Sequence, residues 1–474
     1  MARRVRLTPP DEAAIAAAFA ELRESLGVTV QFAEDVLADA EASAGSRQLP
    51  RRDETAIPFL TIDPAESRDL DQALHLERRA GGFRVRYAIA DVAAFVTPGG
   101  PMDRAAHERG QTLYAPDVDA LLYPPVISHG AASLLPNETR PAVLWTIDLD
   151  AQGQTVEVDV ARALVRSRRK LSYEDVQRAL DDGAAQEPLT LLRDIGKLRQ
   201  RLEAERGGVD LQIPEQEIRH GRGGYELSFR TQLPVERWNA QLSLLTGQQA
   251  ALLMLDAKVG IVRTLPRADD EAVARLRRAA HALGVAWRSG MTYADFVRSL
   301  DPAEPRHKAV LAESTVLLRG SGYEAFDGVE PEHKRHEGVG APYTHATAPL
   351  RRLVDRYTSE VCLAVHAGER VPEWARTALP ELPDTMSQSG RRAAQYEGGV
   401  VSAVEAAVLE HSVGRVFPAV VIDVDGDGDG GVVQLAHPAV TARTTGKHLP
   451  LGQRVDVRLA EADVLRRLVR FEPV

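Results

Sequence analysis

The chain has 474 residues, 44% of them hydrophobic, which is enough for about three domains with cores of their own. Its net charge of −10 excludes a protein that binds nucleic acid through overall positive charge, so any such contact requires local basic patches. The sequence contains no apolar run of about 18 residues and no signal-peptide core, and its single cysteine, Cys362, excludes an intramolecular disulfide, so we expect a cytoplasmic protein without a membrane partner.

The N-terminal region, residues 1–50, is predicted to be helical. One Ala-rich segment starts at Asp11 and runs through Leu22, and a second runs from Gln31 to Ala42. Gly27 separates them, which gives a helix-turn-helix-like outline. A helical appendage that only packs on the rest of the chain is an equally good interpretation.

An acidic stretch follows, in which Asp63, Asp69 and Asp71 lie between two predicted strands. Pro64 ends the first strand, and the Gly81-Gly82 pair predicts a hairpin after the acidic residues. Clustered carboxylate oxygens favour Mg²⁺ or Mn²⁺, and the lack of neighbouring Cys or His ligands argues against zinc. The alternative is a surface turn with solvated acidic residues.

The middle of the chain alternates strands and helices. Predicted strands at 143–150 and 154–165 pair about Gln152-Gly153, and Ser172 is a candidate helix N-cap. Further helices are predicted at residues 189–205, 237–259, 269–284 and 350–366. Three local basic patches stand out, each of which could equally be a solvated face: Arg166 with Arg168, Arg169 and Lys170; His333 to His336; and Arg351-Arg352.

After about residue 411 the pattern changes to short strands, predicted at 414–424, 431–436 and 453–461. Such a run is typical of an OB-fold barrel that binds single strands. Phe417 is the candidate for base stacking, and a buried barrel aromatic is an equal alternative.

Four motifs occur in the order found in one family. They are Asp-Pro-x-x-x-x-Asp-x-Asp at 63–71, Ile89-Ala-Asp-Val92, Gly208 to Glu215, and Tyr343-Thr-His-Ala-Thr-Ala-Pro-Leu-Arg-Arg352. Together they resemble the ribonuclease II and R family of 3′ to 5′ exoribonucleases. The resemblance implies an α+β, multidomain fold with a small helical N-terminal domain (1–50), a mixed α/β RNB catalytic domain (51–405) and a C-terminal OB-fold β-barrel of the S1 type (406–474).

The same resemblance implies roles for individual residues. Asp63, Asp69 and Asp71 would hold Mg²⁺, and Asp71 would matter most to the rate. Arg351 would lie across the scissile phosphate, where a guanidinium stabilises developing charge, although Arg352 could equally make the contact.

Two tyrosines match positions at which the family contacts terminal nucleotides. Tyr114 and Tyr173 would be stacking platforms for RNA bases, and either could instead be a core residue. Among the departures, Gln72 stands where the family has a fourth carboxylate, so Gln72 would be an outer member of the metal shell and one cation would bind more weakly. Ala240 and Gln241 replace paired glutamates, and the N-terminal region is too short and too helical for the relatives' cold-shock domains.

We therefore expect a processive hydrolytic 3′ to 5′ exoribonuclease that degrades single-stranded RNA with a free 3′ end to nucleoside 5′-monophosphates, as a monomer. The main alternative, favoured by Gln72 and the altered glutamates, is an RNA-binding or regulatory protein on a catalytically decayed scaffold. A third interpretation is a transcription factor that uses the N-terminal helices.

Overall fold

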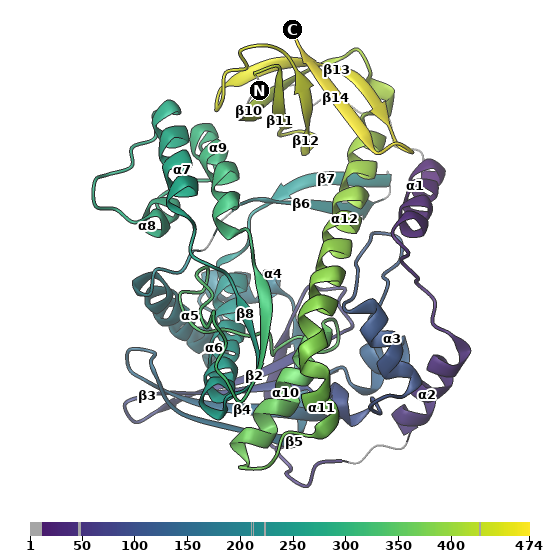
Figure 1. Ribbon diagram of the computed structural model, residues 1–474, viewed down its shortest axis with the longest axis vertical. Helices are drawn as coiled ribbons and strands as arrows, with labels where there is room; N and C mark the ends of the chain where they lie inside the picture. Colours follow the sequence, from purple (N-terminus) through teal and green to yellow (C-terminus); the bar gives the residue numbers. More distant parts are fainter. Residues whose placement is uncertain (1–11, 46–48, 210, 212, 222–223, 426–427) are drawn as a thin grey trace.

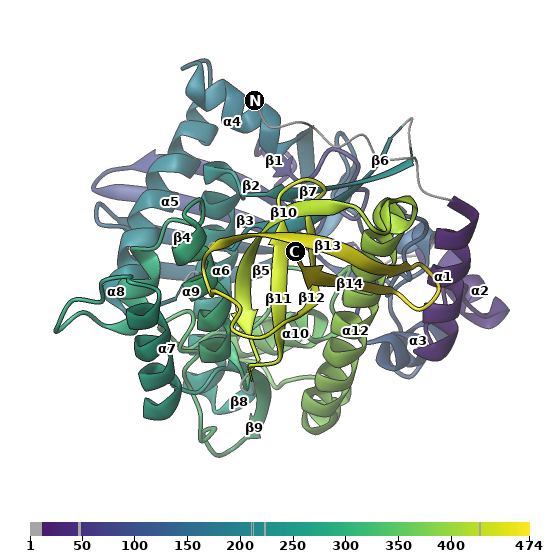
Figure 2. The same ribbon diagram turned by 90° about the horizontal axis from the view of Figure 1, so that it is seen from above.

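The computed structural model describes residues 12–45, 49–209, 211, 213–221, 224–425 and 428–474 (Figure 1). Asp210 and Gln212 of the third motif, residues 1–11 of the N-terminal region and Gly426-Asp427 of the last region lie outside these ranges. A large α+β body carries a small C-terminal barrel, and the long helix α12 (Leu382–Leu409) runs from one to the other. Figure 2 shows this barrel over the middle of the body.

The body is built on a closed five-stranded barrel in the order β1-β2-β3-β4-β5. Neighbouring strands are antiparallel except β1 and β5, which close the barrel in parallel with Ile62 opposite Leu171. Gly82 permits the tight start of β3, because a Cβ there would lie 1.9 Å from the Leu149 carbonyl oxygen. The strands are β1 (Phe59–Ile62), β2 (Gln72–Arg79), β3 (Gly82–Ala90), β4 (Thr139–Asp150) and β5 (Thr155–Leu171).

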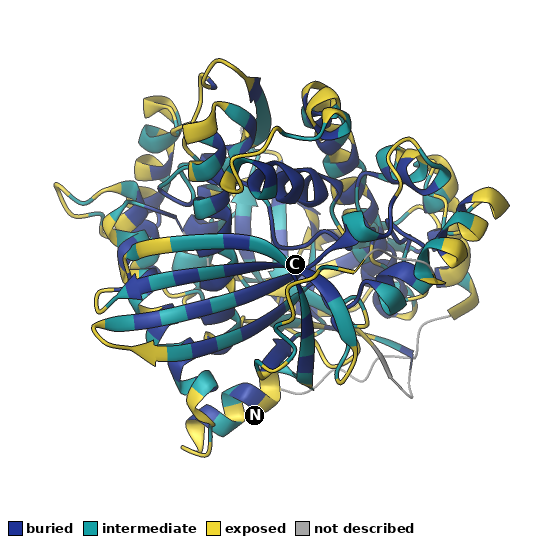
Figure 3. Cartoon of the chain, turned by 90° about the horizontal axis from the view of Figure 1, so that it is seen from below, coloured by how far each residue is buried: buried dark blue, intermediate teal, exposed yellow. Residues whose placement is uncertain are grey.

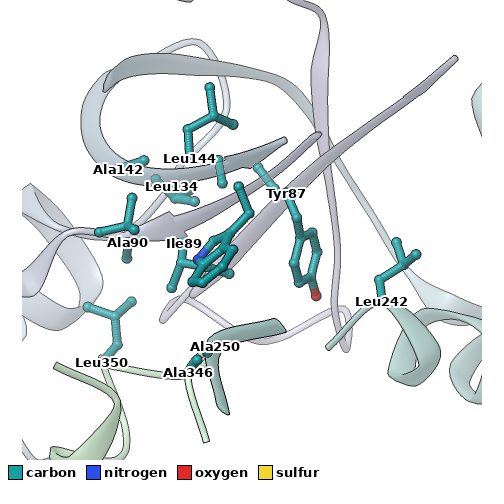
Figure 4. Close-up of a cluster of buried hydrophobic side chains, with 14 of the residues drawn as sticks. Tyr87, Ile89, Ala90, Leu134, Ala142, Leu144, Leu242, Ala250, Ala346 and Leu350 are labelled. Carbon is teal, nitrogen blue, oxygen red and sulfur yellow. The ribbon is translucent and has the colours of Figure 1, made fainter. Parts of the chain in front are cut away.

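Buried residues alternate with more exposed ones along much of β5, the first half of β3 and the second half of β4 (Figure 3), as expected for a sheet with one face on the core, whereas β1 is buried throughout. Helix α6 (Pro234–Ala257) packs on that core and is largely buried, as the sequence predicts. Figure 4 shows Leu242 and Ala250 of α6 close to Tyr87 and Ile89 of β3. The other helical segments of the body are α3 (Pro101–Arg109), α4 (Tyr173–Asp181), α5 (Glu187–Glu205), α10 (Leu353–His366), α11 (Glu373–Ala378), η1 (Val92–Ala94), η2 (Ile127–Ala131), η4 (Leu379–Glu381) and η5 (Glu410–Ser412).

Two hairpins extend the body. The pair β6 (Glu215–Gly221) and β7 (Gly224–Arg230) lies below the small barrel, and β8 (Val259–Thr264) pairs with β9 (Gly322–Asp327). The segment between β8 and β9 forms a helical module with its own apolar core. This module consists of α7 (Asp270–Ala282), α8 (Tyr293–Arg298), α9 (Pro305–Ser314) and η3 (Thr315–Leu318).

The C-terminal region is a second closed five-stranded barrel, in the order β10-β11-β12-β14-β13. Phe417 is fully buried and packs edge-on against Phe471, with ring centroids 6.2 Å apart. The buried-aromatic alternative therefore holds for Phe417, and the base-stacking prediction is wrong because its ring faces the barrel core. The strands are β10 (Val416–Val424), β11 (Gly430–Leu435), β12 (Val440–Thr445), β13 (Arg454–Asp463) and β14 (Leu468–Pro473).

The N-terminal helices α1 (Glu12–Ser25) and α2 (Glu34–Gly45) pack on different parts of the body. Helix α1 lies along α12, where Gly399 leaves room for Leu22, and Arg23 pairs with Asp117 at 2.9 Å. Helix α2 lies on α3 (Figure 1). Because each helix packs mainly on the body, this arrangement does not match the predicted helix-turn-helix-like unit.

Glu405 of α12 joins three parts of the chain. Its Oε1 accepts hydrogen bonds from Gln216 Nε2 of β6 at 2.6 Å and from the Thr441 amide of β12 at 2.7 Å. The side chain is buried, and burial raises the pKa of Glu405 from 4.5 to about 7, although the two donors oppose the rise. Helix, hairpin and barrel thus meet at a carboxyl group that is costly to ionise.

We predict that Glu405→Gln stabilises the protein at pH 8 relative to the wild type. A carboxyl group with a raised pKa stays protonated in the folded chain while it ionises in the unfolded chain, so stability falls as the pH rises from about 4.5 to about 7. At about 1.4 kcal/mol per pH unit, the loss is at most roughly 3 kcal/mol. Chemical denaturation at pH 5 and pH 8 measures it, and an equal effect of the substitution at both pH values would contradict the assignment.

Candidate active site

The acidic residues lie in the loop between β1 and β2, at one end of the first barrel. The Asp63 amide donates to the Leu171 carbonyl at 3.1 Å, which continues the β1–β5 pairing to the start of the loop. Lys170 Nζ donates to the Ala65 and Ser67 carbonyls, each at 2.6 Å. Ser133 Oγ donates to the Arg68 carbonyl at 2.7 Å and accepts from the Leu70 amide at 3.0 Å. The loop that carries the three aspartates is therefore fixed by its neighbours.

The last motif, Tyr343 to Arg352, approaches the same place between β9 and α10. Gly247 of α6 allows this approach, because a Cβ there would lie 2.4 Å from the Thr344 carbonyl oxygen. The Leu350 amide donates to Asp71 Oδ1 at 2.7 Å, between residues 279 positions apart. Arg351 Nε donates to Asp71 Oδ2 at 3.2 Å. Figure 4 shows Ala346 and Leu350 of this segment near Ala90 and Ile89 of β3.

Of the two arginines, Arg351 is the one that faces the site. Its side chain is 45% exposed. Arg352 instead donates from Nε and Nη2 to the two oxygens of Asp355, at 2.6 and 2.8 Å, and Asp355 also accepts from the Ala348 amide at 2.7 Å. Asp355 is completely buried. The structure therefore favours Arg351 as the contact to substrate and gives Arg352 a structural ion pair.

The site holds carboxylates in a desolvated setting. Burial raises the pKa of Asp63 from 3.8 to about 7, with a further rise from Asp69, while Lys170 and Arg351 oppose it. Burial likewise raises the pKa of Asp71 to about 8, opposed by Arg351 and by the Leu350 amide. One buried and one half-buried carboxyl group beside a third acid make a place where added positive charge is favoured.

The two predicted tyrosines flank these acids. Tyr114 is 41% exposed, and its hydroxyl donates to Asp69 Oδ2 at 2.8 Å. Tyr173, the first residue of α4, accepts from Asn239 Nδ2 at 3.3 Å. Burial and the nearby Asp63 raise the pKa of Tyr173 to about 12. Ser172 caps α4 through its Oγ, which accepts from the Asp175 amide at 3.1 Å, as the sequence predicts.

Gln72 lies between the first barrel and the last motif. Its Nε2 donates to the Thr347 carbonyl at 2.5 Å, and its Oε1 accepts from the Tyr87 hydroxyl at 3.0 Å. Tyr87 also shares a hydrogen bond with Ser243 of α6 at 3.0 Å. Both ends of the amide are bonded to protein, so in this arrangement Gln72 supports the motif segment instead of facing a cation.

The sequence analysis does not assign a supporting role to the residues that hold the site together. Two of them carry a local signal: Lys170 belongs to a basic patch, and Asp355 lies three residues after Arg352, a spacing that indicates a helical ion pair. Ser133 and Asn239 carry no such local signal, because their partners are far away in the sequence.

The donor set fits a hard divalent cation. Mg²⁺ commonly uses one or two carboxylates and completes its shell with water and substrate phosphate. Asp63 and Asp71 are desolvated carboxyl groups and Asp69 lies beside them. Within the described ranges, no group of three or more Asp, Glu, His or Cys side chains is placed to hold a metal ion, so the three aspartates do not form a complete site by themselves. The set therefore suits a cation that takes further ligands from the substrate.

Two family models match the chain. The RNB domain matches residues 51–366, and the RNase II-type exonuclease C-terminal S1 domain matches residues 415–474. Ribonuclease R of Escherichia coli is 26% identical over 91% of this chain and 58% of its own length. The chain thus spans less than two thirds of the length of this relative. No helix among the described residues has the length and apolar character needed to span a membrane.

Solved structures share the fold. RNase R of Mycoplasma genitalium, in complex with ribose-methylated single-stranded RNA, superposes with a TM-score of 0.86 at 18% identity, covering 98% of this chain and 79% of that one. Yeast Ssd1, described as a pseudonuclease, has a TM-score of 0.69 at 16% identity, covering 87% of this chain and 53% of that one. The predicted α+β multidomain fold with a C-terminal barrel is confirmed.

We predict that Asp355→Asn lowers the free energy of unfolding by about 3 to 5 kcal/mol, because it leaves the half-buried Arg352 without its carboxylate. Asp327→Asn is the matched control, since it breaks a similar two-bond pair with Arg376 on the surface and should change stability little. Urea denaturation of both variants measures the difference, and equal effects would rule out a special role for the buried pair.

Proposed function

Because the chain belongs to the RNB-domain family, we propose that it is a hydrolytic 3′ to 5′ exoribonuclease that acts on single-stranded RNA and releases nucleoside 5′-monophosphates. The observation that carries this proposal is the meeting of the acidic loop and the last motif at Asp71, through the Leu350 amide and Arg351.

Phosphodiester hydrolysis needs an activated water, neutralised phosphoryl charge and a stabilised leaving oxygen. Asp63, Asp69 and Asp71 would hold Mg²⁺, or Mn²⁺, and the bound cation would supply the activated water and part of the charge neutralisation. Arg351 is exposed on one side and has N–H groups beyond Nε, which suits paired hydrogen bonds to phosphoryl oxygens as their charge rises.

The tyrosines suit the placement of the RNA end. The exposed ring of Tyr114 offers a stacking surface for a base, and such stacking contributes roughly 1 to 3 kcal/mol per base. Tyr173 lies near Asp63 at the start of α4, where Asn239 fixes its hydroxyl. Phe417 and Arg352 are left out of this proposal because their side chains serve the barrel core and the Asp355 pair.

A second candidate is an RNA-binding protein that does not cut. Gln72 favours it, because the amide brings no charge and both its ends bond to protein. The two candidates are separated by RNA labelled at one end and incubated with Mg²⁺. The nuclease releases a labelled mononucleotide from 3′-labelled RNA at once and shortens 5′-labelled RNA progressively. Full-length RNA under both labels, with measurable binding, supports the second candidate.

We predict that Asp71→Asn reduces cleavage by at least about a hundredfold, while RNA affinity measured without divalent cation changes little. The amide can still accept the Leu350 N–H, so the segment stays in place while the charge is lost. Asp182→Asn, a substitution of an exposed acid at the end of α4, is the control and should leave both quantities unchanged. Single-turnover cleavage and a filter-binding titration give the two readouts, and unreduced turnover of Asp71→Asn would refute the assigned role.

A further inference from the structure

The two side chains that face RNA in the proposed site are bonded to two of the acids that face the cation. Tyr114 holds Asp69, and Arg351 holds Asp71. We propose that RNA and the divalent cation bind cooperatively because RNA draws Tyr114 and Arg351 away from these carboxylates and frees oxygens for the cation. This inference rests on the proposed function and adds a thermodynamic coupling between its two ligands.

The contact between Tyr114 and Asp69 sets one half of the coupling. The hydroxyl donates to Asp69 Oδ2 at 2.8 Å while the ring is 41% exposed. In the proposed coupling, a base that stacks on the exposed ring moves the ring away from the position that this hydrogen bond fixes. Stacking therefore favours a ring position in which Oδ2 is available to a cation.

The contact between Arg351 and Asp71 sets the other half. Asp71 Oδ2 accepts from Arg351 Nε at 3.2 Å, whereas Oδ1 accepts from the Leu350 amide at 2.7 Å. A phosphate that engages the guanidinium releases Oδ2 alone, and the backbone amide keeps the carboxylate in place. The freed oxygen belongs to a buried carboxylate, which favours a replacement positive charge strongly.

Coupling of this kind is reciprocal. If RNA raises the affinity for the cation by some factor, the cation raises the affinity for RNA by the same factor, and typical factors are about 5 to 150. Phosphate oxygens can also bind the cation directly, so tighter cation binding in the presence of RNA is not enough to identify this mechanism. The diagnostic quantity is the cation affinity, measured without RNA, of a variant that lacks the hydrogen bond between Tyr114 and Asp69.

Tyr114→Phe is the variant that isolates the bond. It keeps the ring for stacking, removes only the hydroxyl that donates to Asp69, and changes no charge. Tyr293→Phe is the matched control, because it also removes a single tyrosine hydroxyl, at the first residue of α8 in the helical module and outside the proposed site. Arg351 is unsuitable for this test, since its loss would also change the charge beside Asp71.

The test is Mn²⁺ binding measured by electron paramagnetic resonance, with and without single-stranded RNA. The RNA carries phosphorothioate linkages at its 3′ end to protect it from cleavage, and it is checked to be intact. Wild type should bind Mn²⁺ at least fivefold tighter with RNA. Tyr114→Phe should bind Mn²⁺ severalfold tighter than wild type without RNA and show a smaller gain on adding RNA. Tyr293→Phe should match wild type in both states.

Two outcomes overturn the inference. One is a Tyr114→Phe variant whose RNA-free Mn²⁺ affinity equals that of wild type, and the other is a wild type whose Mn²⁺ affinity is indifferent to bound RNA. If labelled RNA is still degraded in either case, the proposed nuclease function stands and the coupling alone fails. A wild type that binds RNA but cuts neither labelled substrate refutes the nuclease function, whatever the Mn²⁺ titration gives.

Discussion

The site depends on one contact between distant parts of the chain, in which Asp71 accepts from the Leu350 amide and pairs with Arg351. Each partner is positioned by a separate part of the fold. The closed barrel and Lys170 fix the acidic loop, while Gly247 and Asp355 fix the segment that ends at Arg351. The buried Asp71 carboxylate meets its two donors only if both the acidic loop and the segment that ends at Arg351 are held in place. The geometry of the site therefore depends on the packing of the body.

The sequence predicted the site from spacing and the elements from local chemistry. The three aspartates between strands predict a cation site, which stays a prediction. The hairpin at Gly81-Gly82 and the cap at Ser172 are confirmed, because turns and helix ends depend on a few adjacent residues. The buried character of α6 followed from its apolar composition. These features are local, which is why a single sequence was enough.

Other features depend on contacts that sequence spacing does not encode. The parallel closure of β1 on β5 and the strands β12 and β14 were missed, because strand pairing is set by the whole barrel. The long helix α12 was also missed, and its surroundings change from body to barrel along its length. The choice between Arg351 and Arg352 was open, since only the fold shows that Asp355 occupies one of them. The inward direction of Phe417 was equally undetermined.

The basic patch at the end of β5 shows how charge is used in a chain of net charge −10. Arg168 donates to the Thr55 carbonyl at 2.7 Å, and Lys170 donates to two carbonyls of the acidic loop. These two cations hold backbone carbonyls in place, so a count of basic residues overstates the positive charge that is free to contact a ligand. Arg351 differs because its partner is the carboxylate of Asp71 and its side chain is 45% exposed. Under the proposed coupling this positive charge is exchangeable, whereas the charges of Arg168 and Lys170 are bonded to backbone.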